Sequence, residues 1–111
     1  MEGAGAALRG ARGSAVIEVL MFTAPWCAPC KPVKRALDEL APRFPSVRFA
    51  EVDVDNEPET GMQFGVLTLP TVVILRDDEA VKVIDGARPR ADYERALQEV
   101  LPAAGGDSLD A

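Results

Sequence analysis

The chain has 111 residues, enough to bury one hydrophobic core, so one domain is expected. Its hydrophobic fraction of 48%, charged fraction of 27% and net charge of −6 are typical of a globular protein and argue against nucleic acid as a partner. No apolar stretch approaches the roughly 18 residues of a membrane span, and residues 1–14 lack the apolar run of a secretory signal. The sequence therefore predicts a cytoplasmic protein without a membrane partner, and we expect a monomer.

The first half of the chain predicts a strand followed by a helix. Residues 1–14 are rich in Gly, Ala and Arg and are interpreted as a flexible leader. Residues 16–22 form a nearly continuous apolar run, which is typical of a central strand buried on both faces. From Ala28 to Phe44 the apolar residues recur at spacings of three and four, which indicates an amphipathic helix. Pro42 is expected to end or kink that helix because its ring removes an amide donor.

The next segment predicts a second strand and a short helix. Residues 47–54 alternate in a strand-like pattern and end at a polar turn. A short helix is expected to follow and to reach Phe64, with Asn56 as its candidate cap and Gly65 as its end.

The remaining elements are a hairpin and a final helix. Strands are predicted at residues 71–75 and 81–84, joined by a turn at 76–79, and residues 102–111 are interpreted as a disordered tail. The order of elements predicts an α/β domain over residues 15–101, with a mixed sheet and helices on both of its faces. One face of the final helix is marked by Tyr93, Ala96, Leu97, Val100 and Leu101.

The two cysteines, Cys27 and Cys30, lie at the predicted start of the first helix. Two thiols at this spacing can close a disulfide with little motion of the backbone. The positive end of the helix dipole favours a thiolate at Cys27, which is predicted to cap the helix and to be the nucleophile. Cys30, one turn further, is then expected to attack the mixed disulfide on Cys27. Pro29 suits the first helical turn, where its missing amide proton is no loss.

Metal binding is the main alternative interpretation of a C-x-x-C pair. A zinc site needs two more ligands, and the chain has neither a third cysteine nor a histidine to supply them. A metal cluster shared between two subunits is a further alternative. The strand before the pair and the helix after it favour thiol–disulfide exchange, and no bound metal is expected.

Two separate segments resemble the thioredoxin family. Residues 22–31, FTAPWCAPCK, are similar to its active-site signature F-x-A-x-W-C-G-P-C-K, and Leu69-Pro70-Thr71 is similar to the segment that carries the family's cis proline. The resemblance covers about residues 15–101 and implies the thioredoxin fold. That fold has a mixed sheet of five strands, or of four if the short leader does not supply the N-terminal strand.

The resemblance implies a role for each matching residue. Cys27 matches the attacking cysteine, Cys30 matches the resolving cysteine, and Pro70 belongs to the catalytic loop. The backbone before Pro70 is expected to pair with an extended client segment. The family's substrate-binding collar corresponds here to Trp26, Ala28, Pro29, Thr68, Leu69, Gly86 and Ala87, although core packing is an alternative role for Leu69.

Three positions depart from the family pattern. Met21 stands where the family buries an aspartate beneath the cysteines, and Glu51 stands where the lysine partner of that aspartate lies. One hypothesis is that Glu51 takes the proton of Cys30, directly or through a water; the alternative is that Glu51 points to solvent and the proton passes to bulk water. Ala28 replaces a glycine between the cysteines, a position that tunes the reduction potential in this family.

The function implied by the resemblance is the reduction of protein disulfides without a bound cofactor. The oxidised pair would be recharged by a flavin-dependent thioredoxin reductase that uses NADPH, so the expected partners are that reductase and disulfide-containing client proteins. A specialised disulfide oxidase or isomerase is the alternative within the same chemistry. A thioredoxin-fold binding module with regulatory cysteines is a third possibility.

Overall fold

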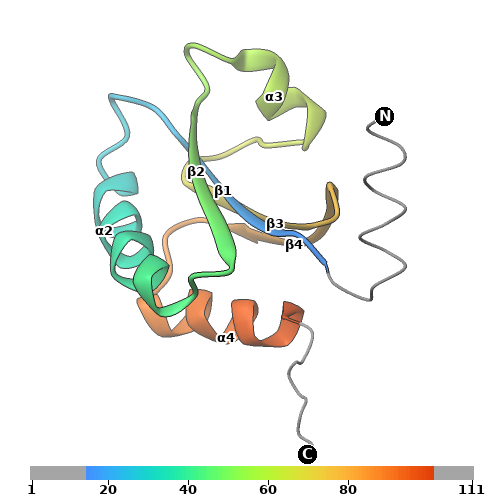
Figure 1. Ribbon diagram of the computed structural model, residues 1–111. Coiled ribbons are helices and arrows are strands. Elements are labelled where there is room, and N and C mark those ends of the chain that lie inside the picture. The colour runs from blue at the N-terminus through green and yellow to red at the C-terminus, as the bar shows by residue number, and fades with distance from the viewer. Residues whose placement is uncertain (1–14, 102–111) are drawn as a thin grey trace, which may run out of the picture.

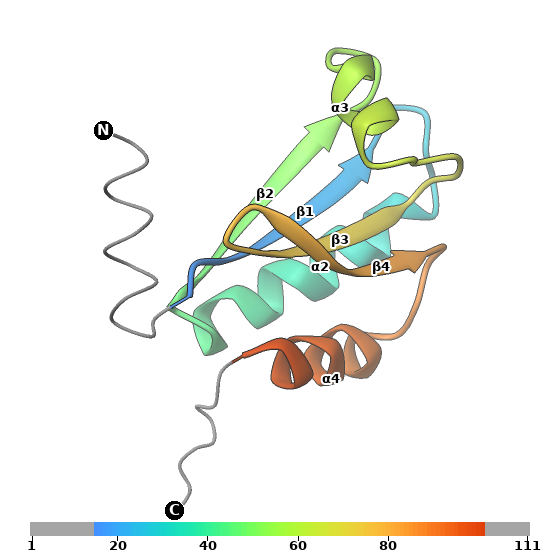
Figure 2. The ribbon, with the colours of Figure 1, turned by 90° about the vertical axis from the view of Figure 1, so that its right-hand side faces the viewer.

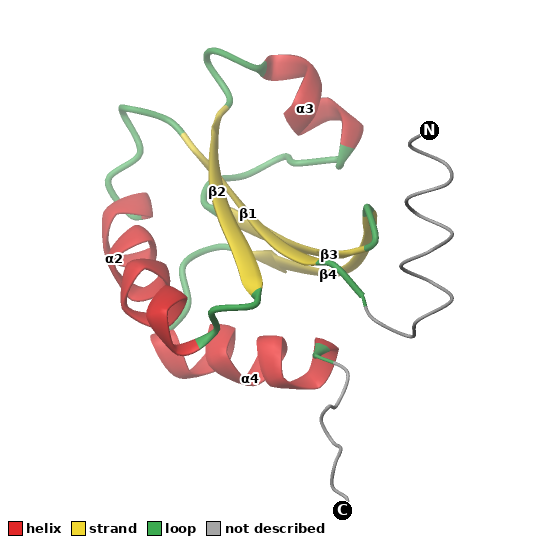
Figure 3. Cartoon of the chain, viewed as in Figure 1, coloured by secondary structure: helices red, strands yellow, loops and turns green. Residues whose placement is uncertain are grey.

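The structure of this chain is a computed structural model that describes residues 15–101, so the predicted leader (1–14) and tail (102–111) lie outside the described residues. Strands and helices alternate along the described part except near its end, where two strands follow each other directly (Figure 3). The strands are β1 (Ile17–Thr23), β2 (Val47–Asp53), β3 (Thr71–Arg76) and β4 (Glu79–Asp85). The helices are α2 (Cys30–Leu40), α3 (Pro58–Gln63) and α4 (Arg90–Val100), with a short 3-10 turn at Ala41–Arg43.

The four strands form one mixed sheet in the order β2-β1-β3-β4 (Figure 1). Strands β1 and β2 are parallel because α2 provides the crossover that a parallel pair requires. The pairs β1–β3 and β3–β4 are antiparallel. Within residues 15–101 the sheet therefore has four strands, and β2 and β4 are its edges there.

Helices cover both faces of the sheet, as predicted. Helices α2 and α4 lie on one face and α3 lies on the other (Figures 1 and 2). Side chains of β1 contribute to the core on both faces of the sheet, because successive residues of a strand point to opposite faces. Val19 and Met21 pack in the cluster under α2 and α4, whereas Phe22 packs in a second cluster beneath α3.

Helices α2 and α4 pack against the same face of the sheet and against each other. Each has only 11 residues and would be marginal alone, so burial of its apolar face stabilises it. At the surface, Arg90 of α4 pairs with Glu39 of α2 at 2.9 Å, and Arg43 in the 3-10 turn after α2 pairs with Glu94 of α4 at 2.8 Å. The buried faces consist of Cys30, Val33, Leu37 and Leu40 on α2, and of Tyr93, Ala96, Leu97 and Val100 on α4.

The first helix is shorter than predicted. It ends at Leu40, and Ala41 continues into the 3-10 turn. Pro42 has no amide proton to donate to the carbonyl of Asp38, so the α-helical ladder stops where the proline was expected to end it. Phe44, predicted on the apolar helix face, follows this turn and packs on the core from there.

The start of α3 differs from the prediction, whereas its end agrees. The amides of Asn56 and Glu57 both donate to the carbonyl of Asp53, at 3.0 and 2.8 Å, so Asn56 belongs to a turn and is not the cap. The helix instead begins at Pro58, which needs no amide partner there. Gly65 ends the segment with a φ of +67°, a conformation that glycine adopts without steric cost.

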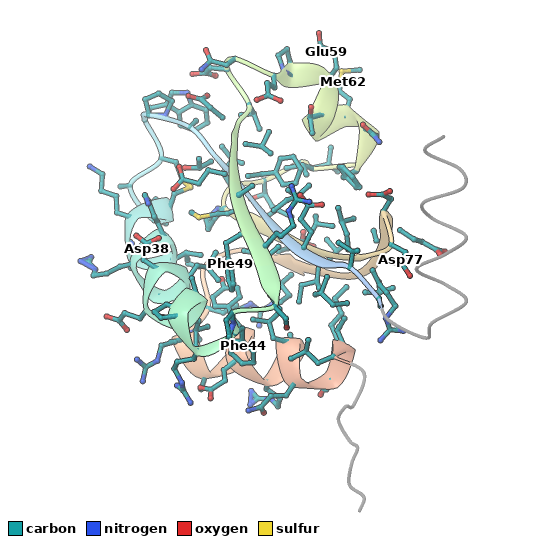
Figure 4. The ribbon with its side chains drawn as sticks, viewed as in Figure 1. Asp38, Phe44, Phe49, Glu59, Met62 and Asp77 are labelled. Carbon is teal, nitrogen blue, oxygen red and sulfur yellow. A yellow bond between two sulfur atoms is a disulfide. The ribbon has the colours of Figure 1, made fainter. Side chains whose placement is uncertain are left out.

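The hairpin between β3 and β4 turns on two residues, Asp77 and Asp78, and not on four. Their φ values of 51° and 72° are those of a tight hairpin turn whose twist matches that of its strands. Asp77 also accepts a hydrogen bond from the amide of Val16 at 2.9 Å and donates its own amide to the Val16 carbonyl at 2.8 Å. The turn, where Figure 4 labels Asp77, is therefore fastened to the residue that precedes β1.

Candidate active site

The cysteine pair lies where the chain passes from β1 into α2. The Cys27 carbonyl accepts the Cys30 amide at 3.3 Å, and the Ala28 carbonyl accepts the Lys31 amide at 3.2 Å. These bonds join residues three apart, and Pro29 stands at the N-cap position, where its missing amide proton is no loss. The helix therefore begins at Cys30, and the prediction that Cys27 caps it is wrong by two residues.

Cys27 and Cys30 are joined in a disulfide with their Cα atoms 5.4 Å apart. Both are buried, at 5% and 3% exposure, in the same cluster as Met21. The two sulfurs differ in their surroundings, because Cys27 lines a surface groove and Cys30 does not. A partner that enters this groove meets Cys27 first.

The groove beside Cys27 has a volume of about 660 Å³ and lies between the cysteine loop, α3 and the loop before β3. The side chains that line it are mostly apolar. It brings together five of the seven predicted collar residues: Trp26, Ala28, Pro29, Thr68 and Leu69. The sequence reasoning missed six further lining residues, namely Val54, Pro58, Gly61, Met62, Val66 and Leu67.

The loop before β3 presents free backbone groups to the groove. The peptide bond between Leu69 and Pro70 is cis, as the resemblance implied. Thr71 donates its hydroxyl to the Thr68 carbonyl at 2.7 Å, and the amide of Gly86 donates to the Pro70 carbonyl at 2.8 Å. Among the described residues no hydrogen bond engages the amide or the carbonyl of Leu69, so both are available to an extended polypeptide.

Gly86 and Ala87, the other two predicted collar residues, do not line the groove. Gly86 has a φ of +81° and is tied to the loop before β3 through its amide. Tyr93 supports the same segment from α4: its hydroxyl donates to the Gly86 carbonyl at 3.4 Å and accepts the Arg88 amide at 3.1 Å. Burial raises the pKa of Tyr93 above its usual value of 10.0.

Trp26 forms one rim of the groove, and 68% of its surface is exposed. Its indole N–H donates to the Asp55 carboxylate at 3.0 Å. Asp55 itself is held by a hydrogen bond from its amide to the side chain of Asp53 at 2.9 Å. The ring is therefore positioned by the turn after β2 and not by burial in the core.

Met21 and Glu51, the two departures near the cysteines, lie opposite each other on β1 and β2. Met21 is buried at 2% exposure. The carboxylate of Glu51 forms an ion pair with the ammonium group of Lys34 at 2.9 Å, and the same ammonium group pairs with Asp38 at 3.1 Å. The hydrogen bond that Lys34 donates to Glu51, followed by the one that it donates to Asp38, raises the pKa of Lys34. The role of Glu51 as acceptor of the Cys30 proton stays a prediction.

Within residues 15–101, no group of three or more histidine, cysteine, aspartate or glutamate side chains is placed to hold a metal ion. In the same part of the chain, none of the helices combines the length and apolarity that crossing a membrane would require.

The mixed sheet, the buried disulfide at the start of a helix and the adjacent cis-proline loop define a disulfide oxidoreductase that works by dithiol exchange. The comparisons agree, since the family model described as thioredoxin matches residues 11–99. This chain belongs to the thioredoxin family.

Individual relatives and solved structures support this placement. A thioredoxin of Mycobacterium bovis is 42% identical over 82 residues, which cover 73% of this chain and 71% of that protein. The crystal structure of thioredoxin from Trypanosoma brucei brucei superposes with a TM-score of 0.72 at 34% identity, covering 85% of this chain and 82% of the other. A structure described for the thiol resolving mechanism of a yeast mitochondrial 1-Cys peroxiredoxin via glutathione/thioredoxin systems also has a TM-score of 0.72, at 29% identity, over 85% of this chain and 88% of that chain.

Proposed function

We propose that this protein reduces the disulfides of client proteins, with Cys27 as the attacking thiolate and Cys30 as the resolving thiol. The groove carries this proposal, because it exposes Cys27 and not Cys30 beside the free backbone groups of Leu69. A client segment that pairs with Leu69 in the manner of an added strand brings its disulfide to Cys27.

The reaction transfers two electrons to the client in two exchanges. The Cys27 thiolate attacks one sulfur of the client disulfide, forms a mixed disulfide and releases the other sulfur as a thiolate. The deprotonated Cys30 then attacks the sulfur of Cys27, which closes the Cys27–Cys30 disulfide and releases the second client thiol. The structure corresponds to the oxidised end of this cycle, with that disulfide closed.

The proton of Cys30 must be removed before the second exchange. We propose Glu51 as its acceptor, through a water, because Glu51 pairs on β2 with the buried Met21 that packs beside Cys30. Lys34 holds the Glu51 carboxylate in place through an ion pair at 2.9 Å.

The partners and the setting belong to the same proposal. Re-reduction requires two electrons from outside the chain, and we assign them to NADPH through a flavin-dependent thioredoxin reductase. A peroxiredoxin is one client class suggested by the structural neighbour described above. We propose that the protein acts as a monomer in the cytoplasm, where the reducing environment favours the dithiol form of the cysteine pair.

Trapping a client on one cysteine tests the assignment of roles. Cys30→Ser should accumulate a mixed disulfide with client proteins through Cys27, because no thiol remains to resolve it. Cys27→Ser should trap none, since Cys30 is 3% exposed and lies outside the groove. Trapping by Cys27→Ser but not by Cys30→Ser would reverse the assignment.

The reduction potential separates a reductase from an oxidase or isomerase. Equilibration with defined dithiothreitol or glutathione buffers should place the potential near about −270 mV, the value of a reducing thioredoxin. A potential near about −120 to −180 mV would move the function to oxidation or isomerisation. A Cys27→Ser, Cys30→Ser double variant that keeps the biological phenotype would instead indicate a binding module.

A further inference from the structure

We propose that Met62 and Leu67 form an outer part of the client groove, which selects clients with an apolar residue and a basic residue near the reactive cysteine. The inference rests on the proposed function and names the clients that this chain prefers. The outer groove is defined as Pro58, Met62, Val66 and Leu67, the end of the groove on the side of α3.

Met62 and Leu67 are exposed without serving the core. Met62 is 78% exposed and Leu67 is 96% exposed, yet both line the groove that contains Cys27. Helix α3 buries Gly61 and turns Met62 outward, and Leu67 follows the turn at Gly65. Contiguous exposed apolar side chains next to a reactive site are typical of a surface that binds a partner.

The size of the groove fits a polypeptide segment and exceeds what a disulfide alone requires. An extended residue in a packed strand takes up roughly 160 Å³, from its rise and the spacings between strands and sheets. The groove of about 660 Å³ is therefore large enough to take a segment of several residues. The pairing site at Leu69 accounts for only part of that length, so the segment continues over Met62 and Leu67.

The rim of the outer groove is acidic. Glu59 lies three residues before Met62, which places both side chains on the same side of α3, as Figure 4 shows at the outer end of that helix. Glu57 stands at the N-cap position of α3. Among the described residues neither carboxylate takes part in an ion pair, and Glu57 accepts only the Thr60 hydroxyl at 3.4 Å, so each can pair with a lysine or an arginine. The occupant is therefore an extended client segment with an apolar side chain in the groove and a basic one at its rim.

Disulfide-linked peptides of defined sequence test this selection. Four peptides carry leucine or glutamine, together with lysine or glutamate, within three residues of one cysteine, and the reduced full chain is assayed with each. We expect kcat/KM to be roughly tenfold higher for the leucine–lysine peptide than for the glutamine–glutamate peptide, with the difference in KM. Added salt should reduce the part due to lysine and leave the part due to leucine.

Variants assign the selection to the outer groove. Met62→Gln and Leu67→Gln should each reduce the preference for leucine roughly threefold, and Glu59→Gln should reduce the preference for lysine. Val83→Thr is the matched control, because Val83 is 53% exposed on β4 and does not line the groove. Its preferences should equal those of the unmodified chain.

A small disulfide, hydroxyethyl disulfide, separates the two levels of the proposal. This compound carries neither an apolar nor a basic side chain, so its reduction by the unmodified chain reports the thiol–disulfide chemistry and not the selection. If the unmodified chain reduces this compound and all four peptides equally well, the selection is overturned while the reductase function stands. If it reduces none of the disulfides, the proposed function fails and the selection fails with it.

Discussion

Met21 and Glu51 occupy paired positions on the parallel strands β1 and β2, but only Met21 enters the core. The Met21 residue is 2% exposed, whereas the side chain of Glu51 is 43% exposed and carries its charge in an ion pair with Lys34. An uncompensated carboxylate costs several kcal/mol in a core, and the edge strand β2 avoids that cost. The core beneath Cys30 is therefore uncharged at this position.

If Glu51 accepts the proton of Cys30, Glu51→Gln should slow the resolution of the mixed disulfide by at least roughly tenfold and shift the pH profile of that step. Stability should change by less than about 1 kcal/mol, because an exposed ion pair contributes little. Stopped-flow release of a trapped fluorescent client measures the step. Asp38→Asn is the control, since Asp38 also pairs with Lys34 but lies on α2. Identical pH profiles for both variants and the unmodified chain would show that the proton of Cys30 passes to bulk water.

Tyr93 should make the folded state sensitive to alkaline pH. Burial raises the pKa of its phenol, so the unfolded chain loses this proton before the folded chain does. The corresponding stability is present in full below about pH 10 and falls as the pH rises through the folded value. Urea unfolding at a series of pH values should show this loss in the unmodified chain.

Tyr93→Phe should remove that alkaline dependence at a cost of about 1–2 kcal/mol at neutral pH. The cost arises because the Arg88 amide loses its acceptor and the Gly86 carbonyl loses a donor. If the stability of Tyr93→Phe falls above pH 10 as steeply as that of the unmodified chain, the assignment to Tyr93 is contradicted.

The hairpin turn allows a stabilising substitution at one of its two positions. Asp78→Gly should stabilise the fold by about 0.5 kcal/mol, because a φ of 72° is unfavourable for a side chain. Asp77→Gly relieves the same kind of strain but loses the hydrogen bond from the Val16 amide, so we expect it to be neutral or destabilising. Thermal unfolding of the two variants measures the difference, and equal stabilities would show that the Asp77 hydrogen bond contributes nothing.

The hydrogen bond between Trp26 and Asp55 should improve the binding of protein substrates. Asp55→Ala should raise KM roughly threefold, equivalent to about 0.6 kcal/mol, because it frees the exposed indole ring to change rotamer. Asp55→Asn keeps an oxygen that can accept the indole N–H and should have a smaller effect. Steady-state reduction of one protein disulfide is the measurement, and an Asp55→Asn effect as large as that of Asp55→Ala would attribute the loss to charge.

The sequence was sufficient to predict the mixed sheet, because it depends on patterns that are local along the chain. The continuous apolar run of β1, the helical spacing before Pro42 and the stop at Gly65 each reflect the geometry of one element. The boundaries that differed depend on competing hydrogen bonds. The side chain of Asn56 is suitable for a cap. The amides of Asn56 and Glu57 instead donate to the carbonyl of Asp53, a pairing that the sequence does not reveal.

The active site was predictable where a motif identified it and not where the fold assembled it. Five collar residues meet in the groove because the motif and the cis-proline loop are brought together by β1 and β3. Met62 and Leu67 belong to no motif, and an apolar residue in a short segment is usually buried. The only signal in the sequence was that Leu67 follows Gly65, beyond the end of the helical pattern.

The burial of the disulfide also determines which molecules can change its oxidation state. An attacking thiolate has to approach in line with the sulfur–sulfur bond, and Cys27 offers only 5% of its surface, at the bottom of the groove. A small thiol gains nothing from the apolar walls around it, whereas a docked protein is held there long enough to react. We therefore expect the cysteine pair to exchange electrons faster with docked proteins than with small thiols.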